Sequence, residues 1–162
     1  MRTAVAITMI LASPAVAQTD KMPDAMRACP GDMIAGTTDV TWRPVPPDVL
    51  PEGAEIAVLC GKPSEKGPFV LRLKLPAGYQ IPAHHHPGEE YVTVLSGDFH
   101  AGMGDKLDKK KTTRLRAGGF LWMNAGMNHY AWTGGVTVVQ VHGMGPFTTQ
   151  YVKSADDPGK PR

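Results

Sequence analysis

Three consecutive histidines, followed closely by two glutamates, are the residues of this sequence best suited to metal chemistry. His84, His85 and His86 precede a Pro-Gly pair, after which come Glu89 and Glu90. Residues two apart in a strand project to the same face, so His84 and His86 can converge on one point while His85 faces away. If a strand resumes after the Pro-Gly turn, Glu90 can turn its carboxylate toward that point. Glu89 is the alternative if the turn is tighter.

A fourth ligand is expected from a distant part of the chain. His129 lies in a later strand-like run, and all-β folds bring distant strands side by side. Imidazoles with one carboxylate suit Fe(II), Mn(II), Ni(II) or Zn(II), and four protein ligands leave one or two coordination positions open. The sequence therefore predicts one divalent metal ion held by His84, His86, Glu90 and His129, with room on the metal for substrate or water. No general acid or base can be assigned, so the catalytic residues are unknown.

The elements that position these residues are predicted to be short strands. Among 162 residues there are 18 Gly and 15 Pro, more than long helices tolerate. Short apolar runs separated by turn residues are typical of a single all-β sandwich or barrel. The predicted strands are 55–60, 69–74, 90–95, 98–103, 112–116, 120–123, 129–132, 136–142 and 147–152, with 40–42 as an edge strand.

The charge of the chain excludes some classes of partner. A formal net charge of +2 is too small to indicate nucleic-acid or membrane-surface binding. The basic run between residues 106 and 116 is accompanied by Asp105 and Asp108 and falls between predicted strands, which favours a solvated hairpin tip over an anion site. A small molecule is the expected ligand.

The first 17 residues match an export signal. Arg2 is followed by an apolar run over 4–12 and by the small-residue pattern Ala15-Val16-Ala17. The apolar run has about half of the ~20 residues that a membrane span needs. Because twin arginines are absent from the segment, we expect a Sec-type signal peptide cleaved after Ala17, periplasmic localisation and no membrane attachment afterwards.

The remaining chain is predicted to contain one folded unit. Residues 18–37 are polar and broken by Pro and Gly, as in an arm or linker; 38–153 form the β domain, and 154–162 form a flexible tail. Cys29 in the arm and Cys60 in the domain can form a disulfide in an oxidising compartment. Two unrelated thiols remain the alternative, because the sequence does not give the closing geometry.

The spacing of the glycines and metal-ligating residues resembles the cupin family. The first cupin motif, G-x5-H-x-H-x3-E-x6-G, is met at all five positions by Gly78, His84, His86, Glu90 and Gly97. Over this part of the chain the match is specific.

The second cupin motif, G-x5-P-x-G-x2-H-x3-N, is met in part. Gly118, Gly126 and His129 are in place, whereas Asn124 stands where proline is usual and Thr133 where asparagine is usual. The two departures affect the turn before His129 and the surroundings of the ligands rather than the ligand set.

The resemblance implies a jelly-roll cupin β-barrel with one divalent ion held inside by His84, His86, Glu90 and His129. From the same resemblance we expect a homodimer. His100 and His142 are either neighbours of the site or surface residues, and the alternation along its strand points Tyr91 away from the pocket.

Two functions fit these predictions, because one barrel hosts many activities. The first is a metal-dependent enzyme acting on a small oxygenated organic molecule, either a dioxygenase or an isomerase or lyase in which the metal polarises a carbonyl. The second is a non-catalytic periplasmic module that binds or senses a small molecule or a metal.

Overall fold

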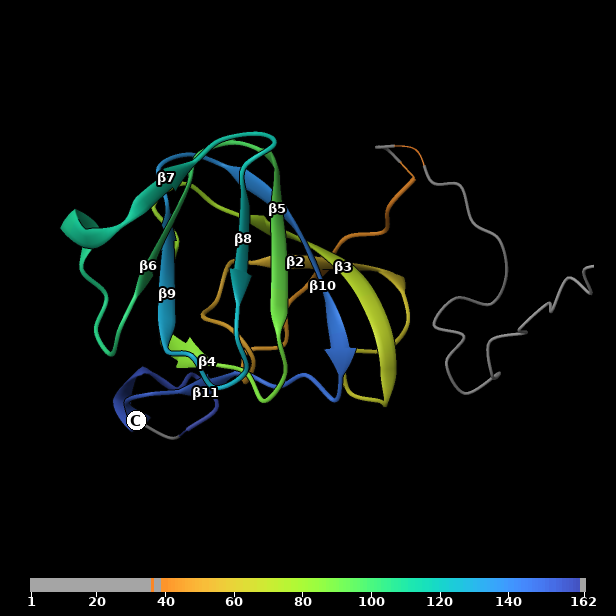
Figure 1. The fold of residues 1–162 in the computed structure, drawn as a ribbon. Coiled ribbons are helices and arrows are strands. Elements are labelled where there is room, and N and C mark those ends of the chain that lie inside the picture. Colours follow the sequence, from red (N-terminus) through yellow and green to blue (C-terminus); the bar gives the residue numbers. More distant parts are fainter. Residues whose placement is uncertain (1–35, 37–38, 161–162) are drawn as a thin grey trace, which may run out of the picture.

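The computed structural model describes residue 36 and residues 39–160, and nearly all of its regular structure is β (Figure 1). The strands are β1 (Arg43–Pro44), β2 (Glu55–Cys60), β3 (Gly67–Leu75), β4 (Gln80–His85), β5 (Glu90–Ser96), β6 (Phe99–Met103), β7 (Thr113–Leu115), β8 (Phe120–Met123), β9 (His129–Thr133), β10 (Thr137–Gly145) and β11 (Gln150–Tyr151). Two single-turn 3-10 helices, η2 (Lys109–Lys111) and η3 (Ser154–Asp156), lie in loops. In this part of the chain no helix is long and apolar enough to cross a membrane.

The strands form two antiparallel sheets that pack face to face, with order β1-β2-β3-β10-β5-β8 in one and β11-β4-β9-β6-β7 in the other. This is the predicted all-β jelly roll. Apolar residues that alternate along the strands fill the space between the sheets, among them Phe69, Leu75, Val94 and Val139, each at most 2% exposed.

The predicted barrel is not closed, and this corrects the sequence-based expectation. Within residues 39–160 no strand pairing joins β7 to β8, the edge strands of the two sheets. The physical reason lies in the turn between them. Gly118 donates its N–H to Val94 of β5, and Gly119 accepts a hydrogen bond from the same residue, both at 2.9 Å. The chain therefore passes from one sheet to the other with its backbone groups directed at β5, and the two edges stay apart (Figure 1).

Most predicted strands agree with the structure within two residues at each end, but three do not. The predicted strand 136–142 is longer in the structure, where β10 continues to Gly145. Residues 40–42 are not a strand; β1 follows at Arg43–Pro44, where only two residues pair with β2. The predicted strand 147–152 shrinks to β11. The structure adds the strand β4, which carries His84; the histidine spacing depends on extended backbone there, but the apolar runs do not predict a separate strand.

Several predictions concern residues that the structure does not describe. The signal peptide at 1–17, most of the arm at 18–37 and Cys29 lie outside the described residues. Cys60 is not a free thiol. The Cys29–Cys60 bridge and the domain boundaries stay predictions.

Candidate metal centre

Three of the four predicted ligands, the histidines, form one group that could hold a metal ion, and the carboxylate of Glu90 lies beside this group. His84 is near the end of β4, His86 follows that strand, Glu90 opens β5 and His129 opens β9. β4 and β9 are neighbouring strands, and His84 lies opposite His129 after a register shift between Ile81 and His84, whereas β5 belongs to the other sheet. All four residues are buried, with 4% to 9% of their surface exposed. The two sheets thus bring together residues up to 45 positions apart in the sequence.

A backbone carbonyl orients each of the three imidazoles. The Nδ1 atoms of His84, His86 and His129 lie 2.7, 2.9 and 2.9 Å from the carbonyl oxygens of Pro82, Thr148 and Met127. A carbonyl oxygen only accepts, so each Nδ1 carries the proton. In a neutral ring the lone pair is then on Nε2, and this arrangement is the usual one for metal-binding histidines.

The imidazole nitrogens are close enough to share one ion. One ring nitrogen from each of His84, His86 and His129 lies within 4.8 Å of the other two. Nε2 of His86 is fully buried and has no hydrogen-bond partner. Leaving a buried polar atom unpaired costs about 1–3 kcal/mol, and a metal ion accepting that lone pair would remove the cost. These residues therefore fit a divalent cation.

Glu90 supplies the negative charge of the site. Its Oε2 is 3.1 Å from Nε2 of His129, and its Oε1 is 3.7 Å from Nε2 of His86. Burial alone would raise the pKa of Glu90, but the hydrogen bond from His129 and the neighbouring imidazoles lower it to about 2. The carboxylate is therefore ionised, and it can neutralise part of the charge of a bound cation.

The imidazoles differ in their protonation. Burial, with the charges of His129 and His86, lowers the pKa of His84 to about 3, and burial also lowers the pKa of His86. For His129 burial acts in the same direction, but the hydrogen bond and charge of Glu90 outweigh it and raise the pKa. Two rings are thus neutral and ready to bind a metal, while the third is paired with Glu90.

The segment after β10 completes the surroundings of His86, and the sequence did not indicate this. The ring of Phe147 stacks on the ring of His86 with centroids 4.0 Å apart, and Thr148 accepts its Nδ1 hydrogen bond. Phe147 also contacts the core residue Phe69 at 5.0 Å between ring centroids. One aromatic residue thus joins the candidate metal centre to the core.

The other candidate residues lie outside the centre. Nε2 of His85 is 2.9 Å from Oε1 of Gln150. His85 therefore points away from the three imidazoles of His84, His86 and His129, which are called the metal-binding group below. Glu89 accepts a hydrogen bond from the hydroxyl of Tyr91, whose ring stacks against His142 on the outer face of the sheet. The alternative Glu89 ligand is therefore not supported, and Tyr91 faces away from the pocket as its position in the strand predicted.

The remaining histidine also lies on an outer face. His100 stacks on Trp132 with centroids 3.8 Å apart, and its Nε2 lies 3.3 Å from a carboxylate oxygen of Asp98. His100 is therefore not a neighbour of the metal-binding group.

Of the two departures from the second motif, Thr133 acts through its side chain, whereas Asn124 acts through its backbone carbonyl, an acceptor that proline would also provide. Asn124 begins the turn before His129, accepting the N–H of Met127 at 3.1 Å, and the N–H of Gly126 in that turn binds the carbonyl of His86 at 2.8 Å. Thr133 is completely buried, and its hydroxyl donates to Pro76 and accepts from the N–H of Tyr79. The hydrogen bond between Gly126 and His86 ties the turn to the His86 segment. The two hydrogen bonds of Thr133 hold the chain in place just before β4.

A small cavity lies beside the metal-binding group. Its volume is about 40 Å³, and His84, Glu90 and His129 contribute the polar part of its wall. The rest of the wall is mainly aliphatic, from both sheets. The group thus faces a space with room for water-sized molecules, enclosed by apolar side chains.

Solved structures share this architecture at low sequence identity. The polyketide cyclase RemF from Streptomyces resistomycificus is similar with a TM-score of 0.65 at 19% identity, covering 80% of this chain and 91% of that one. A putative acetylacetone dioxygenase from Methylibium petroleiphilum has a TM-score of 0.60 at 21% identity, over 82% and 86% of the chains. An RmlC-like cupin from Shewanella frigidimarina has a TM-score of 0.54 at 12% identity, over 70% and 91%. These likenesses show the fold alone.

The fold and the inward-facing histidines define a cupin. The model of the ChrR cupin-like domain family matches residues 30–148, and the chain belongs to that family. Among curated proteins, no sequence matches this chain.

Proposed function

We propose that this cupin is a divalent-metal-dependent enzyme of the dioxygenase type that acts on a small oxygenated organic molecule. One observation carries the proposal: three imidazoles, each held by a backbone carbonyl, present their Nε2 atoms to one point where Nε2 of His86 is buried without a partner. A redox-active metal bound there would supply Lewis acidity and a place for O2.

The protein's own contribution follows from the contacts of the site. The backbone carbonyls keep the Nδ1 protons of His84, His86 and His129 in place, which leaves Nε2 of the two neutral rings, His84 and His86, available to a metal. Nε2 of His129 donates to Glu90, and a bound cation would take the place of that proton. Glu90 keeps a negative charge next to the group. The aliphatic wall of the small cavity limits water near the reacting atoms, which strengthens every electrostatic interaction there.

Metal analysis and O2 consumption test the proposal together. The purified protein is loaded with Fe(II), Mn(II), Ni(II) or Zn(II), dialysed and assayed for metal content, and then for O2 uptake with catechols, flavonols and β-diketones. We expect about one ion per chain and substrate-dependent O2 uptake with iron. The double variant His84→Ala/His86→Ala should lose the metal, whereas His85→Ala, whose ring faces Gln150, should keep it. Stoichiometric metal in the double variant would refute the site.

A second candidate function is a non-catalytic module that binds or senses a metal or a small molecule. It is favoured by the absence, among the residues that line the small cavity, of any titratable group besides Glu90, the two histidines and Tyr130, which is turned toward the loop after β6. Bound metal without turnover on any substrate class would support this candidate against the enzyme. An isomerase or lyase would turn over a carbonyl substrate without consuming O2.

We further propose that the chain is exported to the periplasm after cleavage following Ala17. The support is the pattern of residues 1–17, and the near-neutral mature chain has no charge-based reason to bind nucleic acid or a membrane surface. Protein sequencing from the N-terminus of the periplasmic form should begin at Gln18; a mature protein starting at Met1 would contradict the proposal. The expected homodimer is tested by the mass of the purified protein in solution.

A further inference from the structure

The cavity beside the metal-binding group is too small for an organic molecule. At about 40 Å³ it holds water-sized molecules, whereas an engineered protein cavity that takes up benzene has a volume of about 150 Å³. Any organic ligand of the metal centre must therefore lie, at least in part, in another space that adjoins the centre.

Such a space lies where the two sheets fail to close. A second pocket, here called the edge pocket, has a volume of about 220 Å³ and lies between β8, the last strand of one sheet, and β6 and β7 at the end of the other. Its wall includes Met103 of β6, Leu115 of β7, and Phe120 and Met123 of β8. No charged side chain lines it. Its size and lining suit one compact, apolar molecule.

The edge pocket adjoins the metal centre through the side chains of Ala101 and Leu121. Both residues line the edge pocket and the small cavity. The strand pairing also places the edge pocket next to the metal centre. Met103 is paired with His129 across β6 and β9, and Met123 is paired with Glu90 across β8 and β5. Two methionines of the pocket are therefore the cross-strand neighbours of two residues of the centre.

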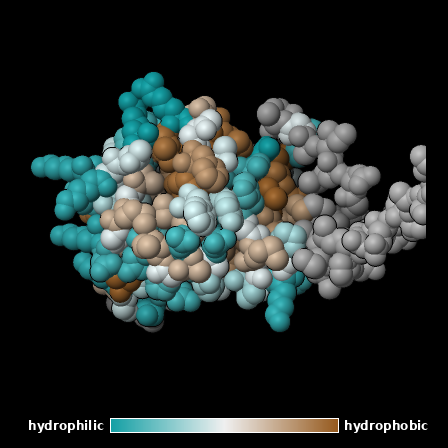
Figure 2. Space-filling model, viewed as in Figure 1, coloured by the Kyte–Doolittle hydropathy of each residue, from teal (hydrophilic) through white to brown (hydrophobic). Residues whose placement is uncertain are grey.

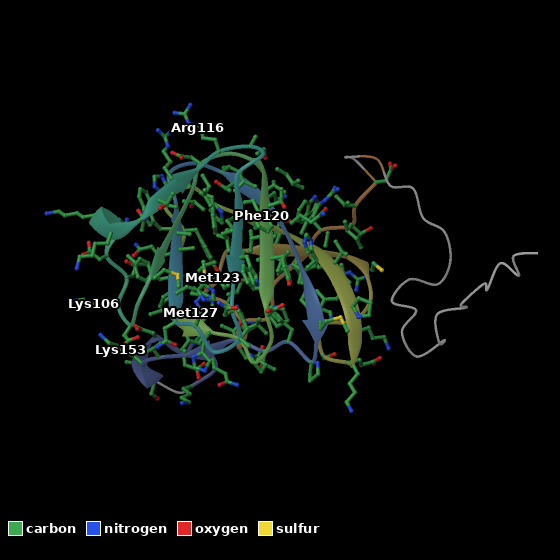
Figure 3. The ribbon with its side chains drawn as sticks, in the orientation of Figure 1. Lys106, Arg116, Phe120, Met123, Met127 and Lys153 are labelled. Carbon is green, nitrogen blue, oxygen red and sulfur yellow. The ribbon has the colours of Figure 1, made fainter. Side chains whose placement is uncertain are left out.

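The protein surface around the edge pocket is exposed to solvent and apolar. Met103 and Phe120 are 50% and 55% exposed. Figure 3 shows Phe120 and Met123 along β8, with Met127 below them in the loop that leads to β9. In the same view, Figure 2 shows hydrophobic side chains reaching the surface around β8, with long hydrophilic side chains extending to the left. A molecule can therefore enter the pocket from solvent without the sheets separating.

We propose that the edge pocket binds the organic ligand of the metal centre, a compact and largely apolar molecule about the size of one six-membered ring, with Leu121 as the partition between ligand and metal. Thioether sulfur and aromatic rings make favourable contacts with a second ring, which Met103, Met123 and Phe120 can provide. A charged ligand would lose its hydration with no partner in the pocket. The link to the metal rests on the function proposed above, but binding to the pocket does not.

The first test measures binding without any metal. Toluene is titrated into the full-length metal-free protein with isotope-labelled methionine methyl groups, assigned by single Met→Leu variants, and the methyl NMR signals are followed. We expect saturable shifts at Met103 and Met123. Met144, which is 51% exposed on β10 and outside the pocket, is the matched control and should not shift. Benzoate, with the same ring and a charge, should have no effect at the same concentration.

A variant separates pocket binding from general affinity for apolar surface. Met103→Lys places a charge in the wall at an exposed position, so the fold is retained, and it should weaken toluene binding about tenfold or more. Met144→Lys should leave binding unchanged. Equal shifts at all methionines, or toluene binding that survives Met103→Lys, would overturn the proposal.

The second test measures the link to the metal. With Co(II) loaded, the protons of bound toluene should relax faster than with Zn(II), and Leu121→Ala should increase that difference because it removes the partition. Failure to load Co(II) would count against the proposed function and leave the metal-free result intact. Co(II) loading with pocket binding but no enhanced relaxation would refute the assignment of the pocket to the metal centre.

Discussion

The carboxylate of Glu90, and not that of its neighbour, meets the imidazoles. Glu90 opens β5 and points between the sheets, where Nε2 of His129 lies 3.1 Å away; Glu89 is in the preceding turn and accepts the hydroxyl of Tyr91. One position in the chain thus separates a buried counter-charge from a surface residue. Such a difference follows from the alternation of side chains as the chain enters a strand.

Replacing the two glutamates separately tests this difference. Glu90→Gln keeps the shape but removes the charge that faces a bound cation, so metal affinity should fall about 10–100-fold, the range typical of groups that support metal ligands. Isothermal titration of the metal-free protein with Zn(II) measures the change. Glu89→Gln should leave the affinity unaltered, and an equal loss in both variants would contradict the assignment.

A second prediction about a single residue concerns the buried hydroxyl of Thr133. Thr133→Val keeps the volume but removes the closer acceptor of the N–H of Tyr79, leaving only the carbonyl of Pro76 at 3.4 Å, and takes away the hydroxyl that donates to that carbonyl. The free energy of unfolding should therefore fall by about 1–3 kcal/mol. Urea unfolding measures this. Thr93→Val on the outer face of β5 is the control, because its hydroxyl makes no side-chain hydrogen bond among the described residues, and it should change stability by no more than about 0.5 kcal/mol.

At the scale of elements, tight turns set the strands that carry the ligands. Gly97, between β5 and β6, has φ = 92°, and a Cβ added there would lie 2.4 Å from the carbonyl oxygen of Val136 and 2.6 Å from Cα of Thr137. Gly78, before β4, has φ = 73° but open space around the position of a Cβ. The two motif glycines are thus required for different reasons.

Replacing each of these glycines with alanine should distinguish the cost of a left-handed backbone from the cost of a steric clash. Gly78→Ala carries only the cost of a left-handed backbone, about 1–2 kcal/mol, whereas Gly97→Ala adds a collision with backbone atoms that cannot move independently. Gly97→Ala should therefore lower the melting temperature clearly more than Gly78→Ala does, as measured by circular dichroism. Equal effects would show that the space at Gly97 is not needed.

At the scale of the whole molecule, the candidate metal centre connects the two sheets. His84 and His129 come from one sheet and Glu90 from the other, and no strand pairing joins the sheets at the β7 and β8 edges. An ion held by these residues would act as a cross-link that exists only in the folded state.

Metal binding should therefore stabilise the entire domain. A free metal concentration 100 times Kd adds about 2.7 kcal/mol to the free energy of unfolding, which raises the melting temperature by several degrees for a domain of this size. Differential scanning calorimetry with Zn(II), and then with excess EDTA, measures the shift and its reversal. The double variant His84→Ala/His86→Ala should show no shift, and a shift of the same size in that variant would place the metal elsewhere.

The fold class and the residues that could bind a metal were predictable from local patterns in the sequence. The short apolar runs indicated an all-β sandwich or barrel, and the resemblance to the cupin family implied the jelly roll. The motif spacing from Gly78 to Gly97 singled out His84, His86 and Glu90. Both are local properties: strand alternation decides which side chains share a face, and turn residues decide where a strand ends.

The tertiary structure alone decided how the site is completed and where it opens. Phe147 and Thr148 contact His86 from a segment about 60 residues away, and the edge pocket exists because β7 and β8 do not pair. Neither feature has a local signal. A stacking contact depends on how two distant segments pack, and the open edge depends on the β7–β8 turn bonding to Val94 rather than on the composition of either strand.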